Sequence, residues 1–294
     1  MNILLHRKRH FIAASLLLVC ACTAKQLPPY AIYDFENALA DGLSGLTTDS
    51  NMDLWTIQER RQHLLQIQGG APFTAKASFP IQGIPKDVDL EAITALGNNQ
   101  FALGSELDTD ERILDSIYLI EVDENVAHVK STISIPYSHW QIQPKANHGI
   151  EALCYAQNKL LVGIESVLEE KGQRYAPLLL YALAEKKAAP LKLKLTTSQG
   201  KLSALACRHE ETSKSILVFA LERHFGIGRL LKFRIDSSLQ LSEPELVYDF
   251  APEMSELPNL EGISFGQDGQ IHLISDNNFG GISGPTKIIT LGNL

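Results

Sequence analysis

Acidic residues recur at the ends of short apolar strands in this chain, and they are the side chains with the clearest potential for chemistry. In the stretch NLEGISFGQDGQIHLISDNNFG, residues 259–280, Glu261 and Asp276 stand at the outer ends of two apolar strands. A two-residue turn at Asp268-Gly269 would place these two carboxylates opposite each other. Directly opposed like charges destabilise a strand pair, so crowded carboxylates must acquire a cation or hold a proton.

Four other hairpins repeat this arrangement. Counting outward from each turn predicts four further facing pairs, which are Glu91 with Glu106, Glu151 with Glu165, Ser44 with Glu59, and Ser203 with Glu222. Three hairpins thus carry an acid on both strands, and two carry one acid each. A fold that gathers the five hairpins must therefore gather eight carboxylates.

The hairpins belong to an internal repeat with a period of roughly fifty residues. The repeated segments are LSGLTTDSNMDLWTIQER, LEAITALGNNQFALGSEL, IEALCYAQNKLLVGIES, LSALACRHEETSKSILVFALER and LEGISFGQDGQIHLISDN. A third apolar strand follows each segment, a fourth usually follows that, and no long helical periodicity separates the units. The repeat predicts an all-β fold, a five-bladed β-propeller of four-stranded blades, with six blades as the alternative if strands are miscounted.

The two ends of the repeat predict how the ring closes. The last unit stops after its third strand, TKIITL, whereas the strand YAIYDF, residues 30–35, precedes the first unit. An exposed terminal edge strand invites aggregation. We therefore expect YAIYDF to complete the last blade, so that residues 30–294 form a single propeller domain.

The first strand of every propeller blade lines the axis, so the acidic hairpin ends should converge at one mouth of the central channel. Hard oxygen ligands without a Cys/His cluster favour calcium over zinc. The expected metal ligands are Glu91, Glu106, Glu151, Glu165, Glu261 and Asp276. The expected ligand-binding residues around them are Arg60, Glu59, Glu222, Asn277 and Asn278.

A structural alternative explains the same acids without a metal. They could cap solvent-facing strand ends and form ion pairs with nearby bases such as Arg60, Arg61, Arg223, His148 and His224. The motif GISFG, residues 262–266, matches a nucleophile elbow in letters only, because Ser264 lies inside a repeated strand and no helix follows it.

The N-terminus has the pattern of an export signal. A basic stretch, HRKRH, precedes the apolar run FIAASLLLV and then VCACT, in which Cys22 resembles the lipidated cysteine of a bacterial lipobox. We expect residues 1–21 to be a signal peptide of lipoprotein type and residues 22–29 to be an anchor linker; an ordinary secretory signal is the alternative. The predicted location is the outer membrane facing the periplasm, or outside the cell.

Composition limits the partners. The chain has 294 residues, of which 45% are apolar, so it can bury a substantial core. Its formal charge of −8 becomes −11 without the signal segment, which carries Arg7, Lys8 and Arg9 and no acid. This charge argues against nucleic acid. We expect a monomer whose only membrane contact is the lipid anchor.

The folded part contains two cysteines, Cys154 and Cys207. The repeat places them one position out of step on different strands, so their side chains should point to opposite sheet faces. We therefore expect two buried thiols rather than a disulfide.

Several of these segments together resemble one bacterial family. The motif ALERHFG at residues 220–226 is similar to the L-E-R-x-F-G of the esterase-like phytase family, and NLEGISF with SDNNF resembles that family's last repeat. The resemblance spans nearly the whole mature chain. It implies an exported propeller and ester or phosphoester hydrolysis, with the acidic mouth as the site.

Two functions follow for the acidic mouth. In the first, a cation polarises a small anionic ester or phosphoester and activates a water molecule, and a carboxylate accepts the proton of that water. A positively charged side chain neutralises the anionic group of the substrate. The candidate catalytic residues are Glu91, Glu261, His224 and Arg223. In the second, calcium makes the loops rigid for a ligand or a partner protein, without catalysis. Fold does not decide between them.

Overall fold

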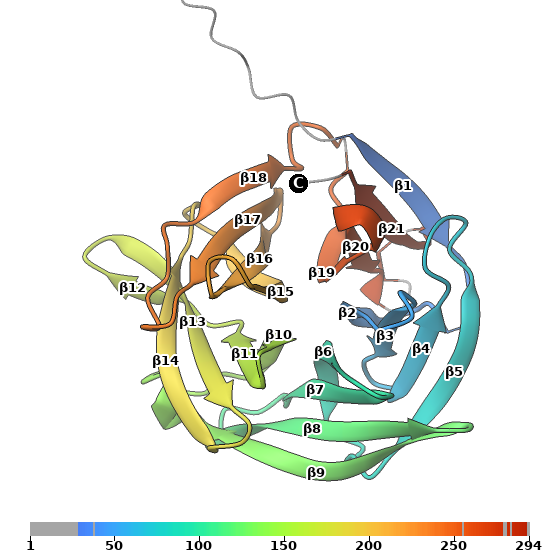
Figure 1. Ribbon diagram of the computed structural model, residues 1–294, viewed down its shortest axis with the longest axis horizontal. Coiled ribbons are helices and arrows are strands. Elements are labelled where there is room, and N and C mark those ends of the chain that lie inside the picture. Colours follow the sequence, from blue (N-terminus) through green and yellow to red (C-terminus); the bar gives the residue numbers. More distant parts are fainter. Residues whose placement is uncertain (1–28, 38, 255, 279–280, 283, 293–294) are drawn as a thin grey trace, which may run out of the picture.

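The computed structural model describes residues 29–37, 39–254, 256–278, 281–282 and 284–292 (Figure 1). This part of the chain is all-β, and its helical segments are two short 3₁₀ turns, η1 (Tyr137–His139) and η2 (Gln267–Gly269). None of its helices has the length and apolar character needed to span a bilayer. The predicted signal peptide and the predicted lipidation site Cys22 lie outside the described residues.

The strands form four sheets. One sheet has the order β1 (Tyr30–Phe35), β21 (Thr286–Leu291), β20 (Ile271–Asp276) and β19 (Asn259–Phe265). A second contains β15 (Lys201–Glu210), β16 (Ser215–His224), β17 (Ile227–Ile235) and β18 (Glu245–Asp249). A third contains β10 (Ile150–Ala156), β11 (Lys159–Ile164) and β13 (Gln173–Ala182), with β12 (Leu168–Glu170) and β14 (Lys187–Lys194) both paired to β13.

The fourth sheet has eight strands and consists of two antiparallel meanders. The first meander contains β2 (Leu43–Thr48), β3 (Leu54–Gln58), β4 (His63–Ile67) and β5 (Ala75–Gln82). The second contains β6 (Asp89–Gly97), β7 (Gln100–Glu106), β8 (Leu114–Asp123) and β9 (Val126–Pro136). A short parallel pairing of β5 with β9 joins the two meanders.

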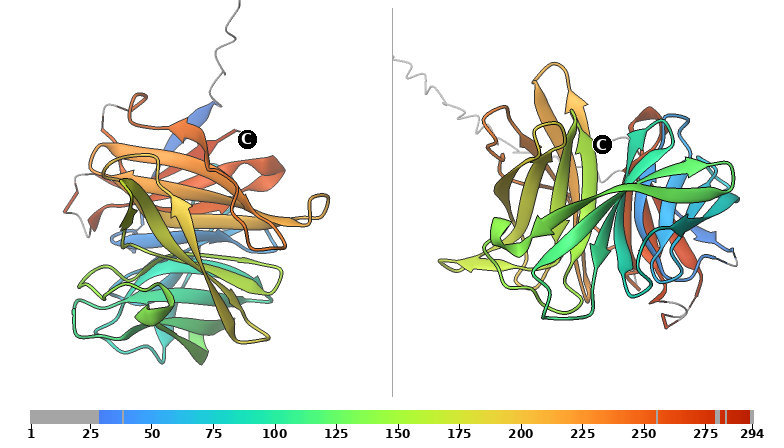
Figure 2. Two further views of the ribbon diagram at one scale, coloured as in Figure 1. Left: turned by 90° about the vertical axis from the view of Figure 1, so that its left-hand side faces the viewer. Right: turned by 90° about the horizontal axis from the view of Figure 1, so that it is seen from below.

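The innermost strands surround a common axis, which gives a propeller-like ring (Figure 1). Strand β2 contacts β6, β6 contacts β10, β10 contacts β15, β15 contacts β19, and β19 contacts β2. These are the five repeated first strands, and their central residues are buried because each strand packs against its own sheet and against its neighbours. Figure 2 shows the ring edge-on, with connecting loops projecting from both of its faces.

The predicted closing strand is confirmed. Strand β1, which is YAIYDF, pairs antiparallel with β21, which is TKIITL, from Tyr30 opposite Leu291 to Phe35 opposite Thr286. The pairing joins the first strand of the described chain to the last one and protects the edge of β21.

The prediction of two free thiols is wrong, because Cys154 on β10 and Cys207 on β15 form a disulfide with their Cα atoms 5.5 Å apart. The two strands belong to different sheets that pack face to face within one apolar cluster. Where two neighbouring sheets of the ring pack together, the two surfaces in contact are opposite faces of the repeated unit. Residues one position out of step point to opposite faces of their own sheets, so both sulfurs point into the contact. The prediction failed because it applied the alternation rule of a single sheet to a contact between sheets.

We predict that reduction of this disulfide destabilises the fold. The bridge spans 53 residues of sequence, and closure of a loop of that size stabilises a protein by roughly 2–4 kcal/mol. Urea denaturation with and without a phosphine reductant should show a lower midpoint after reduction. A Cys154→Ser/Cys207→Ser double variant should no longer respond to the reductant, and an unchanged wild-type midpoint would contradict the prediction.

Candidate metal centre

A β-bulge recurs at one equivalent place in each of the five inner strands. The register shifts lie between Leu90 and Ala92, Ile150 and Ala152, Leu202 and Ala204, Leu260 and Gly262, and, in β2, between Ser44 and Thr47. In four strands the unpaired residue is the second of the repeated motif, which is Glu91, Glu151, Ser203 or Glu261. Bulges re-aim side chains and are frequent beside active sites.

The bulges make the predicted cross-strand pairs wrong. Across the strand ladder, Asp276 pairs with Asn259, Glu106 with Asp89, and Glu222 with Leu202. The other two acids lie just beyond the paired strands: the backbone N–H of Glu165 donates to the Gly149 carbonyl oxygen, and that of Glu59 donates to the Gly42 carbonyl oxygen. The extra residue in each bulge shifts the register, and the last hairpin shifts again because η2 lengthens its turn. The acids are therefore staggered along the strands instead of directly opposed.

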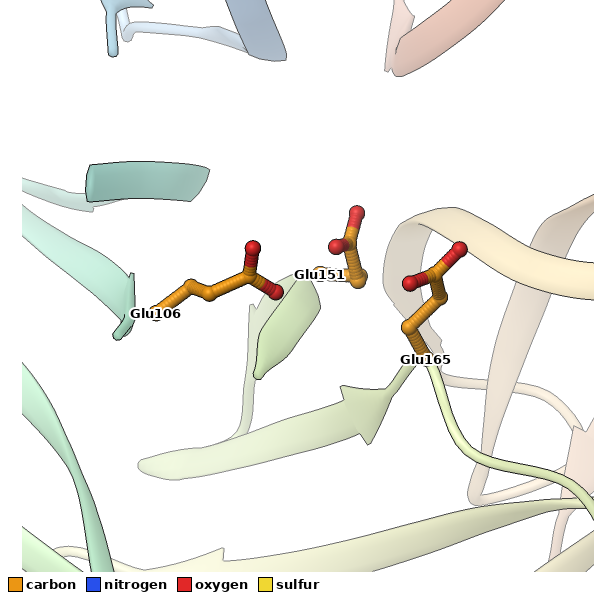
Figure 3. Close-up of side chains that lie close together, drawn as sticks. All are labelled: Glu106, Glu151 and Glu165. Carbon is orange, nitrogen blue, oxygen red and sulfur yellow. The ribbon is translucent and has the colours of Figure 1, made fainter. Parts of the chain in front are cut away.

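Three carboxylates nevertheless meet at the mouth. Glu106, Glu151 and Glu165 each offer one oxygen, and these oxygens all lie within 4.8 Å of one another (Figure 3). Glu106 ends β7, Glu151 is the bulge residue of β10, and Glu165 follows β11. Glu106 and Glu151 are only 6% and 7% exposed, so few water molecules reach the cluster.

The partners of the cluster neutralise it incompletely. The Gly149 N–H donates to Glu106 Oε2 at 2.6 Å, and Lys201 Nζ donates to Glu165 Oε1 at 2.9 Å. His148 Nδ1 lies 3.7 Å from Glu165 Oε2. Lys201 is the cation that hydrogen-bonds to this group, and the charge of Arg223 also acts on Glu151 and Glu165.

A second acidic group lies beside the first. Asn259 Nδ2 donates to Glu261 Oε1 at 2.9 Å and to Asp276 Oδ2 at 3.3 Å, so it joins these two acids. A guanidinium nitrogen of Arg223, Nη2, lies 2.6 Å from Glu261 Oε1. Arg223 Nε and Glu261 Oε2 are both buried and have no hydrogen-bond partner. Buried polar atoms normally have partners, so these two atoms indicate a place for a ligand.

The pKa values of the acids show that the two groups form one electrostatic unit. Burial, followed by the charges of Asp276 and Glu261, raises the pKa of Glu59 to about 8. Burial raises the pKa of Glu106 to about 7, although the Gly149 N–H opposes the shift. Burial also raises the pKa of Glu261 to about 7 against the effect of Arg223, and the charge of Glu165, which belongs to the first group, contributes to this rise.

The two bulge glutamates Glu91 and Glu151 have pKa values well above the usual range. Burial is the main cause for both, and the charges of Glu59 and Glu106 add to it for Glu91, while those of Glu91 and Glu165 add to it for Glu151. Glu91 is partly buried, whereas Glu151 is buried.

A ring of aliphatic side chains explains the burial. Each inner strand contributes one residue two positions after the acid or serine, and the ring is Leu46, Ile93, Leu153, Leu205 and Ile263. A cavity of only about 10 Å³ remains at this level, with Glu151 and Glu261 at its edge. The far end of the axis opens into a separate cavity of about 130 Å³ that contains the disulfide and Ser264. Water therefore reaches the carboxylates from one side only.

Other predicted residues are placed outside this cluster. Glu222 accepts four hydrogen bonds from the backbone and hydroxyl groups of Thr196 and Thr197, so it stabilises a turn. Asn277 binds Asp41 and the Gly42 N–H and thus holds the loop before β2. The ring of His224 packs against the ring of Phe225 at 5.1 Å.

Two predicted residues lie at the margin of the acidic group. Asn278 contributes its backbone N–H, which donates to Asp276 Oδ1 at 2.6 Å. Arg60 Nε lies 3.6 Å from Asp89 Oδ2, and its side chain is 65% exposed. Ser264, which its sequence context excludes as a nucleophile, lies within strand β19, and its hydroxyl shares a hydrogen bond with Thr48 Oγ1 in the far cavity.

The sequence reasoning missed three residues at the mouth. Asp89, Asn259 and Lys201 each stand two positions before the bulge residue of their strand. Asp89 pairs with Glu106 across the strand ladder, the Asn259 amide donates to Glu261, and the Lys201 ammonium donates to Glu165. The spacing is a usable signal, since residues two apart on a strand point to the same side.

Comparisons with known proteins agree with this architecture. The family model for phytase-like proteins, described as esterase-like activity of phytase, matches residues 38–279. No curated protein sequence gives a significant match.

Two solved structures have similar folds. The PQQ-bound aldose sugar dehydrogenase of Streptomyces coelicolor is 12% identical, with a TM-score of 0.51 over 90% of this chain and 99% of that chain. An exo-β-1,3-galactanase of Phanerochaete chrysosporium with bound β-1,3-galactotriose is 8% identical, with a TM-score of 0.55 over 90% of this chain and 63% of that chain. At such identities the likeness concerns the fold alone.

We predict that the metal-free protein loses stability as pH rises from about 5 to 8. Folded-state pKa values of about 7 for Glu106 and Glu261 exceed ordinary glutamate values, so the folded state binds more protons than the unfolded state across this range. The unfolding free energy should fall with rising pH by roughly 1–3 kcal/mol for each such group. Urea denaturation in a chelator at several pH values measures this slope, and a flat or rising slope would contradict the prediction.

Glu151→Gln should stabilise the metal-free protein at pH 8, because a buried carboxyl group among other acids must either carry an unfavourable charge or take up a proton, and both cost free energy in the folded state at this pH. The expected gain is about 1–2 kcal/mol, measured by urea denaturation in a chelator. Glu121→Gln, which changes an ion-paired glutamate on the outer side of β8, is the control and should have little effect. A destabilised Glu151→Gln protein would indicate that the carboxylates are paired structural groups.

Proposed function

We propose a hydrolytic function from one premise, which is that the chain belongs to the phytase-like family, described as esterase-like activity of phytase. In this proposal the acidic mouth binds a divalent cation, calcium, and hydrolyses phosphoesters or carboxylic esters. The observation that supports it most directly is the convergence of Glu106, Glu151 and Glu165 from separate strands.

The donor set fits a hard cation. Calcium binds oxygen ligands at about 2.3–2.6 Å, so two ligands of one ion lie at most about 5 Å apart. The three carboxylate oxygens lie within 4.8 Å of one another, which satisfies this limit. Glu106, Glu151 and Glu165 would hold the ion, and it would polarise the bound ester.

Arg223 and Glu91 supply the remaining chemistry in this proposal. Arg223 is held by Glu261 and keeps a buried Nε without a partner, so it can donate to an anionic oxygen of the substrate. Glu91 lies among the other acids, and its raised pKa makes its carboxylate a stronger proton acceptor than an ordinary glutamate. Glu261 orients the guanidinium.

The finer features of the fold and location are also proposals. We count the eight-stranded sheet as two blades, and the closed ring of five inner strands supports a five-bladed propeller. The disulfide supports an oxidising compartment, such as the periplasm. Lipidation at Cys22, anchoring in the outer membrane and a monomeric state rest on the sequence alone.

We expect calcium-dependent turnover of aryl phosphates or acyl esters by the purified protein, and we expect Glu151→Gln to lower kcat/KM by about 100-fold or more. The control Glu121→Gln should retain wild-type activity. Calorimetry should show weaker calcium binding by Glu151→Gln at an unchanged fold.

The outcomes separate this proposal from a non-catalytic calcium-stabilised binding propeller. Calcium binding that is lost in Glu151→Gln, without turnover of any ester tested, would favour the binding protein. Equal melting temperatures with and without calcium, magnesium or manganese would contradict the metal site itself.

A further inference from the structure

A cavity of about 240 Å³ opens directly beside the acidic mouth. Its wall extends from Asn259 on the innermost strand β19 to Ile32 on the outermost strand β1 of the same sheet. Leu257, in the connection from β18 to β19, also lines the cavity. Its side chain packs closely on Gly228 of β17 in the neighbouring sheet, where an added Cβ atom would lie only 2.9 Å from it. The cavity therefore runs outward from the mouth along the sheet that contains β19 and β1.

The cavity shares a wall with the second acidic group, which contains Glu261 and Asp276. Asn259 and Asp276 line it, and the same Asn259 amide binds the Glu261 carboxylate that holds Arg223. An ester oxygen bound to Arg223 would therefore place the rest of the molecule beside the cavity.

The outer part of the cavity is apolar. Ile32 and Ile282 line it and are 45% and 41% exposed, which places them among the few exposed large apolar side chains of the described chain. Leu257, Pro258 and Pro285 complete this surface. Exposed apolar side chains gathered in a concave site indicate ligand binding.

The charged residues that line the cavity disfavour a second anionic group on the bound ligand. Its charged lining residues are Glu256, Asp276 and Lys287, and the ammonium of Lys287 pairs with Asp34. Negative charge thus exceeds positive charge along the wall, so phosphate groups beyond the one at the mouth would be repelled.

From this arrangement we infer that the substrate is a phosphomonoester with one anionic head and a short uncharged apolar group, of the size of a phenyl ring or short alkyl chain, that occupies the cavity. A ring that carries several phosphates does not match it. This inference rests on the proposed function, since the head binds at the acidic mouth.

Binding of two non-hydrolysable probes tests the inference without requiring turnover. Calorimetry in calcium should show that phenylphosphonate binds the wild-type protein at least about tenfold more tightly than methylphosphonate, because only the phenyl group reaches the apolar wall. Ile282→Asp should abolish this preference and leave methylphosphonate affinity within about twofold. The backbone N–H of residue 282, which donates to the Asn277 carbonyl oxygen, is retained in this variant.

Ile113→Asp is the matched control. Ile113 is also an exposed isoleucine, at 77%, in the connection between the second and third strands of its unit, and it does not line the cavity. The control should keep the tenfold preference. Thermal denaturation should show that both variants melt like the wild type.

Each outcome has a distinct meaning. Equal affinities of the two phosphonates in the wild type, or a preference that survives Ile282→Asp, would overturn the inference and leave the calcium-dependent turnover assay as an independent test of function. No binding of either phosphonate would contradict both the inference and the proposed function. Turnover of multiply phosphorylated rings at the rate of phenyl phosphate would also overturn the inference.

Discussion

Mutual repulsion among carboxylates in a poorly hydrated space is the constraint on which the rest of this structure depends. Glu106, Glu151 and Glu165 approach within 4.8 Å, and burial raises the pKa of Glu106 to about 7. An arrangement of this kind opposes folding unless a cation or protons compensate it. The ring of packed sheets must therefore supply stability that the mouth removes, which is the usual relation between a rigid scaffold and a strained site.

The scaffold fixes the carboxylates by two devices. In four of the inner strands the bulge turns the second residue of the motif away from the regular ladder, and the aliphatic ring formed by the residues two positions later closes the axis beneath it. The same repeated four-residue motif thus provides both the charges and the apolar floor that keeps water from them. Repetition of one local structure around the axis accounts for the concentration of charge.

Loops on the acidic face are held by buried polar contacts as well. Arg112, only 7% exposed, donates to the carbonyl oxygens of Leu107, Thr109 and Lys145, and it pairs with Asp115. These contacts connect the loop after Glu106 to the loop that leads into Glu151. These hydrogen bonds restrict the movement of both loops, and a metal site requires ligands held at a defined separation.

The sequence by itself determined the strand repeat, the ring closure by residues 30–35 and the family, because strand periodicity and short motifs are local properties of the chain. It also identified Glu106, Glu151 and Glu165 as members of one acidic group. Only the tertiary structure decided which acids meet, because bulges and a lengthened turn shift the strand registers. Counting residues outward from each predicted turn cannot foresee these shifts. The Cys154–Cys207 disulfide and the cavity beside Asn259 likewise depend on how neighbouring sheets face each other, and that packing is a non-local property that no single repeat encodes.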